Sequence, residues 1–197
     1  MIDDYTAFLH QKELLAQPSG FTVPIESLNP HAFDYQQAIT RWALQRGKSA
    51  IFSRYGTGKT LMQLDWADQV CRHTGGDVLI LAPLAVARQT QHEGEKFGIR
   101  ATVCRTPADL APGINVTNYE LLHKFPLDQF AGVVLDESSI LKHIESKTRG
   151  AMLEGFARTP YKLCCTATPS PNDHVELGGH AEFLGVLSQL EMLATFF

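Results

Sequence analysis

The stretch that decides the predicted fold is Ser53-Arg54-Tyr55-Gly56-Thr57-Gly58-Lys59-Thr60. It follows the apolar run 49–52, which predicts a short strand, and it opens a predicted helix from about Lys59 to His73. A loop that grips phosphate needs backbone N–H groups that point inward, and glycines leave room for that approach. The order of strand, glycine-bearing loop and helix therefore predicts a phosphate-binding loop.

Two side chains at the end of this loop carry the expected chemistry. Lys59 supplies a mobile cation for the β and γ phosphates of a nucleoside triphosphate, and the Thr60 hydroxyl is placed to ligate magnesium. We therefore expect ATP with Mg²⁺ as the ligand. The loop departs from the usual pattern because Ser53 stands where glycine is common. The alternative interpretation is a glycine-rich turn that enters an ordinary helix. The nucleotide-binding residues predicted in the loop are Gly56, Thr57, Gly58, Lys59 and Thr60.

An acidic pair further along the chain fits the second half of such a site. The apolar run Val133-Val134-Leu135 ends in Asp136 and Glu137. Magnesium needs an oxygen anion opposite the threonine, and Asp136 is expected to hold the metal through water. Glu137 is expected to orient or deprotonate the attacking water. Alone, the pair could equally be an exposed acidic turn after a strand.

The rest of the chain alternates short apolar runs with helical patterns. Runs that are apolar throughout are typical of parallel strands covered by helices on both faces, so the sequence predicts an open α/β sandwich with the ligand at the strand ends. The expected strands are 49–52, 78–82, 102–104, 114–117, 132–135 and 161–166, and the expected helices are 3–16, 33–46, 59–73, 85–97, 146–156 and a tail from about 174. The expected apolar face of the helix 33–46 is Phe33, Ile39, Trp42 and Ala43.

The composition indicates a single globular domain. The chain has 197 residues, of which 44% are hydrophobic, and its formal net charge is -4, so contact with a polyanion would need a local basic patch. The four cysteines form no C-x2-C pair, which predicts reduced thiols and no zinc site. The N-terminus lacks the pattern of a signal peptide, and no apolar run is long enough for a membrane helix. We expect a cytoplasmic protein with no membrane partner.

Several short motifs fall into the order found in superfamily 2 helicases, and the chain resembles the Swi/Snf-type and phage-encoded DEAD/DEAH-box members of that superfamily. Phe33-Asp34-Tyr35-Gln36 is similar to the upstream motif that recognises adenine, which implies roles for Phe33 and Gln36 in nucleotide binding. Leu81-Ala82-Pro83-Leu84 is similar to motif Ia and Val116-Thr117-Asn118-Tyr119-Glu120 to motif Ib. Asp136-Glu137-Ser138-Ser139 and Cys165-Thr166-Ala167-Thr168-Pro169 are similar to motifs II and III.

The resemblance implies a three-layer phosphate-loop NTPase fold of the RecA-like type, and it implies contacts with a nucleic-acid backbone. Family members make these contacts through motifs Ia and Ib, which implicates Pro83, Thr117 and Asn118, while motif III couples the ATP state to the nucleic acid and implicates Thr166 and Thr168. Each motif also has a simpler interpretation. Gln36 could be a solvated glutamine, Thr117 and Asn118 could cap a helix, and the two threonines could be turn residues. Basic residues available near these motifs are Arg88, Lys96, Lys142, Lys147 and Arg149.

Complete motors of this class have a second lobe of similar fold, and too few residues follow Pro169 to form one. The expected organisation is an N-terminal helix and connector over 1–30 and one ATP-binding lobe over 31–197. We expect such a lobe to bind ATP but hydrolyse it slowly without a second lobe or a partner protein in trans.

The sequence is compatible with three functions. The leading prediction is the ATP-binding lobe of a DNA-dependent helicase or translocase, with DNA favoured over RNA. The second is a non-motor module whose attachment to DNA or to a protein is switched by ATP, although such a module has no need of Glu137. The third is an unrelated kinase or transporter-type ATPase, which has no use for Gln36 or Pro169.

Overall fold

The computed structural model describes residues 17–142, 146–170 and 176–196. Its described part contains one six-stranded sheet in the order β1-β6-β5-β2-β4-β3, and every neighbouring pair of strands is parallel. The predicted α/β fold with a parallel sheet is therefore confirmed. The strands are β1 (Lys48–Phe52), β2 (Val78–Ala82), β3 (Ala101–Val103), β4 (Ile114–Asn118), β5 (Gly132–Asp136) and β6 (Tyr161–Thr166).

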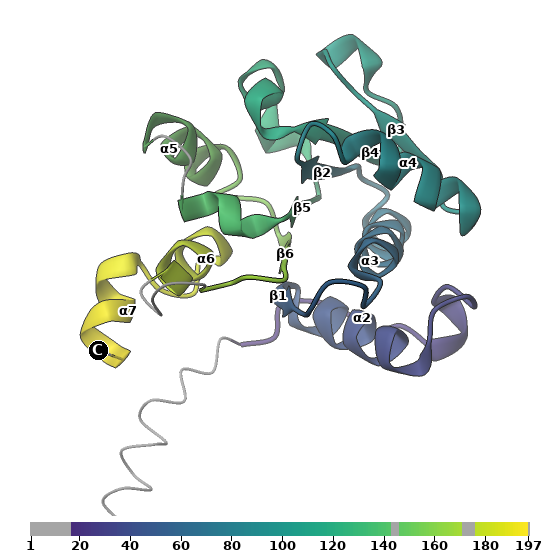
Figure 1. The fold of residues 1–197 in the computed structure, drawn as a ribbon, viewed down its shortest axis with the longest axis horizontal. Coiled ribbons are helices and arrows are strands. Elements are labelled where there is room, and N and C mark those ends of the chain that lie inside the picture. The colour runs from purple at the N-terminus through teal and green to yellow at the C-terminus, as the bar shows by residue number, and fades with distance from the viewer. Residues whose placement is uncertain (1–16, 143–145, 171–175, 197) are drawn as a thin grey trace, which may run out of the picture.

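Helices cover both faces of the sheet, as Figure 1 shows. One face carries α2 (Asp34–Arg46), α3 (Lys59–Thr74) and α4 (Ala87–Lys96). The opposite face carries α5 (Ser146–Gly155), α6 (Leu177–Leu184) and α7 (Gln189–Phe196). Parallel strands need such crossover connections, and the resulting three layers bury β2, β4 and β5 along their whole length.

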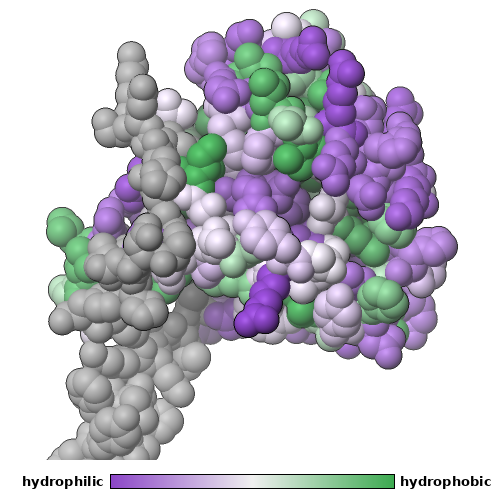
Figure 2. Space-filling model, viewed as in Figure 1, coloured by the Kyte–Doolittle hydropathy of each residue, from purple (hydrophilic) through white to green (hydrophobic). Residues whose placement is uncertain are grey.

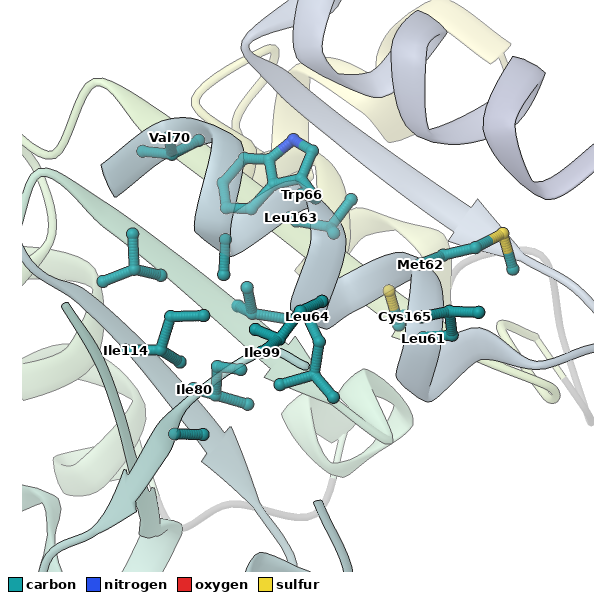
Figure 3. Close-up of a cluster of buried hydrophobic side chains, with 14 of the residues drawn as sticks. Leu61, Met62, Leu64, Trp66, Val70, Ile80, Ile99, Ile114, Leu163 and Cys165 are labelled. Carbon is teal, nitrogen blue, oxygen red and sulfur yellow. The ribbon is translucent and has the colours of Figure 1, made fainter. Parts of the chain in front are cut away.

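The larger core cluster lies between α3 and the sheet. Leu64 and Trp66 of α3 are fully buried, and Figure 3 shows α3 side chains directed toward Ile80 and Leu163 on the strands. Almost every position of α3 from Leu61 to Val70 is buried, because the sheet, α2 and α4 all contact this helix. The phosphate-loop segment therefore enters a closely packed helix, which gives the loop a rigid base.

The predicted apolar face of α2 is partly wrong. Phe33 and Trp42 are 68% and 48% exposed, whereas the buried stripe consists of Gln36, Thr40, Ala43 and Leu44. These four positions follow the spacing of one helical face, so the helix is rotated relative to the face expected from its largest apolar residues. The rotation turns the amide of Gln36 inward toward α3 and the phosphate-binding loop.

Two other predicted boundaries change. The helix expected from Ala85 begins at Ala87, because residues 83–86 form a turn in which the Val86 N–H donates to the Pro83 carbonyl. The expected continuous tail is divided into α6 and α7 at Gly185, which adopts a left-handed φ of 69°. The N–H of Val186 donates to the Ala181 carbonyl, the closure that ends a helix at such a glycine.

The N-terminal helix predicted over 3–16 lies outside the described residues, and the following connector is irregular apart from a 3-10 turn at Ile25–Ser27. Further 3-10 turns are Pro107–Asp109, Tyr119–Lys124, Leu127–Gln129 and Ser138–Lys142. All four cysteines are free. Within the described residues, no helix is both long and apolar enough to cross a membrane.

Candidate nucleotide-binding site

The residues predicted to bind the nucleotide, apart from Thr57, line one cavity beside the carboxyl ends of the strands. The cavity has a volume of about 740 Å³, which suits a nucleotide-sized ligand. Loop residues, the acidic pair and the upstream aromatic motif all contribute to its wall. The lining residues are His31, Phe33, Tyr35, Gln36, Tyr55, Gly56, Gly58, Lys59, Thr60, Leu61, Val86, Gln89, Glu93, Phe97, Asp136 and Glu137.

The loop backbone requires glycine at two positions. Gly56 and Gly58 have φ angles of 79° and 75°, a region that other residues rarely adopt. A Cβ on Gly58 would lie 2.2 Å from Nε2 of Gln36, whereas a Cβ on Gly56 would meet no atom within 4 Å. Gly58 also caps the N-terminus of α3, so the positive end of that helix faces the cavity. The open space at Gly56 leaves the loop backbone accessible to an anion.

Side chains within the loop hold its shape. The hydroxyls of Ser53 and Thr57 share a hydrogen bond of 2.8 Å, and Thr57 Oγ1 donates to the Arg54 carbonyl. Ser53 thus has a structural partner at the position where glycine is usual. The Lys59 ammonium donates to the carbonyls of Ser53 and Arg54 at 3.0 and 3.1 Å and lies 5.3 Å from the centre of the Tyr55 ring. These contacts hold the cation at the rim of the loop.

Gln36 joins the upstream motif to the loop. Its Nε2 donates to the Thr57 carbonyl at 3.0 Å, and its Oε1 accepts from the Phe33 N–H at 2.9 Å. An amide has two donor hydrogens and two acceptor lone pairs, so one of each remains for a ligand in the cavity, with the amide plane already fixed. Tyr35 donates its hydroxyl to the same Thr57 carbonyl at 3.0 Å, and its ring stacks on that of Phe33.

Asp136 is held in a buried position at the end of β5. Its Oδ1 accepts from Gln63 Nε2 at 2.7 Å and from the Glu137 N–H at 3.1 Å. The Tyr119 hydroxyl donates to its backbone carbonyl. Burial raises the pKa of the Asp136 carboxyl above its ordinary value, while the hydrogen bonds from Gln63 and Glu137 and the charge of Lys59 act to lower it. Oδ2 accepts no hydrogen bond among these contacts, so it would be available to a metal ion.

Glu137 lies beside the last strand of the sheet. Its Oε2 accepts from Thr166 Oγ1 at 3.3 Å, and the same threonine oxygen accepts from the Thr168 N–H at 3.1 Å. The two threonines predicted from motif III therefore contact the acidic pair by one direct and one relayed hydrogen bond. Cys165 lies opposite Asp136 in the pairing of β5 with β6, and this register brings the two motifs together.

The residues predicted for nucleic-acid contact are not part of the cavity wall. Asn118 caps the next 3-10 turn through Leu121 N–H, and the buried Thr117 hydroxyl donates to the Cys104 carbonyl. Asn118 thus has the capping role that its sequence also allowed, whereas the Thr117 hydroxyl bonds across to Cys104 and caps no helix. Pro83 follows β2 in a partly exposed turn.

Two of the five basic residues keep an exposed position in the described structure. Arg88 and Lys96 are exposed on α4, and Figure 2 shows a mostly hydrophilic surface there. Arg149 forms an ion pair with Glu182 and is therefore not a free cation. The side chains of Lys142 and Lys147 lie outside the described ones.

Three supporting residues had no role assigned from the sequence. Gln63 and Tyr119 both bind Asp136, and Tyr35 braces the loop. Gln63 could have been found, because it lies four positions after Lys59 and so occupies the same face of α3 one turn later. The contacts of Tyr35 and Tyr119 depend on tertiary packing, for which the sequence holds no local signal.

No protein-family model matches the sequence, and no curated protein matches it. Solved structures do match. The Sulfolobus solfataricus SWI2/SNF2 ATPase core in complex with dsDNA superposes with a TM-score of 0.72 at 21% identity, covering 88% of this chain and 40% of that one. The UvsW helicase from bacteriophage T4 gives a TM-score of 0.66 at 14% identity, with 80% and 58% covered. The Pyrococcus furiosus Hef helicase domain gives 0.62 at 19% identity, with 77% and 35% covered.

These likenesses fix the fold. The chain has the RecA-like α/β fold that these solved helicase and SWI2/SNF2 structures share, and the match extends over most of its length. It spans only 58% of the UvsW chain and 40% of the SWI2/SNF2 core, so it corresponds to part of each of those proteins.

Proposed function

We propose that this chain binds Mg-ATP and acts as the first ATPase lobe of a nucleic-acid-dependent motor of the superfamily 2 type. The observation that carries the proposal is the shared cavity, which Lys59, Thr60, Asp136 and Glu137 all line. An apolar cavity alone would fit many ligands. A cation, a hydroxyl and two carboxylates around a helix N-terminus fit a triphosphate with its metal.

The loop and the upstream motif supply binding. The backbone N–H groups near Gly56 and Gly58 and the Lys59 ammonium receive the phosphates. Gln36 reads one edge of adenine with its remaining donor and acceptor, and the exposed ring of Phe33 provides a surface on which the base can stack. Thr60 and Asp136 would hold Mg²⁺, which when bound would neutralise charge on the β and γ phosphates.

Glu137 supplies the base for hydrolysis. A water oxygen bonds to the γ phosphorus, and the bond from that phosphorus to the bridging oxygen breaks with its electrons passing to ADP. The water proton passes to the Glu137 carboxylate and then to the released phosphate. Thr166, which donates to this carboxylate, connects the reaction to the loop after β6. That connection gives a route by which nucleic acid could alter turnover.

The partner in turnover is a second lobe. In related phosphate-loop enzymes an arginine from another domain or protein raises turnover by roughly 10³ to 10⁵. The described residues place no arginine side chain within the cavity wall. We therefore propose that residues 31–197 act as one lobe that hydrolyses ATP slowly alone, and that a second lobe or partner protein completes the site. Double-stranded DNA is the proposed nucleic acid, bound through backbone contacts near Pro83, Thr117 and Asn118.

The rival proposal is a module that ATP switches between two binding states without turnover. The contact between Thr166 and Glu137 favours the motor, because a switch gains nothing from a carboxylate fixed beside the triphosphate. Both proposals require ATP binding, but only the motor requires ATP hydrolysis, so a measurement of hydrolysis distinguishes them.

The deciding experiment measures ATP affinity and phosphate release for the wild type and for Glu137→Gln, each with no nucleic acid, duplex DNA, single-stranded DNA or RNA. We expect micromolar ATP binding by both forms, slow turnover by the wild type, and a loss of at least about 100-fold in the variant. Duplex DNA should increase wild-type turnover or ATP affinity. Equal turnover by the two forms would favour the switch, and a wild type that binds no ATP would overturn both proposals.

A further inference from the structure

The turn that presents Glu137 has an unusual backbone. Among the described residues, Glu137 is the single non-glycine with a positive φ, at 51°. Residues other than glycine adopt a positive φ at an energetic cost and keep it only when their surroundings hold the backbone there. The Ile140 N–H donates to the Glu137 carbonyl, which closes the turn on one side. Further contacts are needed to fix the direction of the Glu137 side chain.

The residue after Glu137 is anchored by a distant histidine. Ser138 Oγ and His180 Nε2 share a hydrogen bond of 2.9 Å, and both residues are buried. His180 belongs to α6, beyond the loop that follows β6. Its ring meets that of Phe52 at the end of β1 edge-to-face, with ring centres 5.2 Å apart. The histidine thus connects the turn after β5 with the strand that leads into the phosphate-binding loop.

The helix that carries His180 is itself fixed at its C-terminal end. Lys162 on β6 donates its ammonium to the Phe183 carbonyl at 3.0 Å, and Arg149 on α5 pairs with Glu182. Because α6 is tied to the sheet and to α5, it can hold His180 at a constant distance from Ser138. A contact made by a rigid helix restricts the turn more than one made by a mobile loop.

We propose that His180 is a positioning residue for hydrolysis: through Ser138 it holds the Glu137 turn in its left-handed conformation and so directs the carboxylate toward the attacking water. This inference rests on the proposed ATPase function. It assigns Glu137 two supports, Thr166 on its carboxylate and the Ser138–His180 pair on its backbone. Loss of the second support should reduce turnover while leaving ATP binding intact, because neither Ser138 nor His180 lines the cavity.

The test compares single-turnover hydrolysis and ATP affinity across variants of the full chain. His180→Leu keeps an apolar side chain beside Phe52 and removes the hydrogen bond, and Ser138→Ala removes the same bond from the other side. We expect each to lower the rate of hydrolysis of bound ATP by about 10- to 100-fold, with the ATP dissociation constant changed less than about threefold. His180→Gln places an amide near the position of Nε2 and should recover most of the rate.

Two comparisons separate positioning from general destabilisation. The double variant His180→Leu with Ser138→Ala should be no slower than the slower of the two single variants, because both changes remove one shared interaction. Phe156→Leu serves as the stability control, since Phe156 packs beside Phe183 of α6 and has no hydrogen bond to the Glu137 turn. It should lower the melting temperature and leave the hydrolysis rate of bound ATP near the wild-type value.

The outcomes separate this inference from the proposed function. A wild type that never hydrolyses bound ATP overturns both. An active wild type with unchanged rates in His180→Leu and Ser138→Ala overturns the positioning role alone. The positioning role is also overturned if the rate loss merely tracks melting temperature as in Phe156→Leu, or if the two single losses multiply in the double variant.

Discussion

Thr166 Oγ1 donates a hydrogen bond to Glu137 Oε2 across the adjacent ends of β6 and β5. The same oxygen accepts from the Thr168 N–H, so Thr166 links the loop after β6 to the acidic turn after β5. A change in the loop after β6 therefore reaches the carboxylate through a single side chain.

Replacement of this side chain should uncouple the two elements. Thr166→Val keeps the size of a buried side chain and loses the hydroxyl, so ATP turnover should fall several-fold and its response to duplex DNA should disappear, with ATP affinity retained. Phosphate release with and without DNA provides the measurement. Thr90→Val on α4 is the matched control, because it also deletes a buried hydroxyl but lies outside the cavity wall. DNA stimulation that survives in Thr166→Val would contradict the coupling role.

Gln36 and Tyr35 should differ in what they contribute to nucleotide binding. Gln36→Ala removes the amide placed to read adenine, so the preference for ATP over GTP should fall by about 10-fold or more. Tyr35→Phe removes a brace on the Thr57 carbonyl and should weaken ATP and GTP binding equally and modestly. Titration calorimetry with both nucleotides distinguishes the two effects. An unchanged ATP-to-GTP ratio in Gln36→Ala would show that the base is read elsewhere.

The two loop glycines should respond unequally to alanine. Gly56→Ala places a Cβ in open space and costs only the left-handed backbone, about 1–2 kcal/mol of unfolding free energy. Gly58→Ala bears a similar backbone cost and also displaces Gln36 from Phe33 and Thr57, which adds roughly 1 kcal/mol for each lost hydrogen bond. Urea unfolding of both variants measures the difference. Equal destabilisation would mean that Gln36 moves aside without loss.

The Asp136→Asn variant should become more stable than the wild type, by a margin that grows as the pH rises. Burial raises the folded pKa of Asp136 above 3.8, so the folded chain holds this proton more tightly than the unfolded chain. The favourable contribution is complete below 3.8 and is lost as pH rises through the folded pKa, where a buried charge must form. Asparagine avoids that charge and still accepts from Gln63. Its stability advantage over the wild type, measured by urea unfolding, should grow between pH 4 and pH 7.

Asp65→Asn is the control for that experiment. Burial also raises the pKa of Asp65, and its carboxylate accepts from the Asn29 N–H away from the cavity. Both variants should show the same trend of stability with pH. Only Asp136→Asn should abolish the dependence of ATP binding on Mg²⁺. A magnesium dependence that survives in Asp136→Asn would remove this carboxylate from the metal site.

The fold could be predicted from the sequence because its signals are local. The apolar run at 78–82 and the helical pattern after Lys59 are set by residues that adjoin one another, and both elements occur where expected. The face of α2 could not be predicted in the same way. Trp42 is the largest side chain of this helix and was expected to be buried, yet the packing of α2 against α3 buries Gln36 and Thr40 instead. Tertiary contact decides which side of such a helix is covered.

In the candidate site too, local sequence signals could be predicted and tertiary contacts could not. Loop residues and the Asp136–Glu137 pair are recognisable because phosphate and metal chemistry restricts the residue types at fixed spacing. The order of strands, which sets β6 beside both β1 and β5, has no such local signature. The contacts of His180 with Ser138 and Phe52 arise only from that order, since the three residues lie on segments remote in sequence.

The position of β6 between β1 and β5 also has a consequence for biogenesis. The strand that leads into the phosphate-binding loop gains its neighbour only when the last strand of the sheet has been synthesised. During translation β1 has no strand partner until β6 is made, whereas β2, β4 and β5 can already associate. Pairing between strands so distant in sequence is slow. Nucleotide binding should therefore be one of the final properties that a nascent chain acquires, and ATP in the cell would favour chains that have completed their sheet.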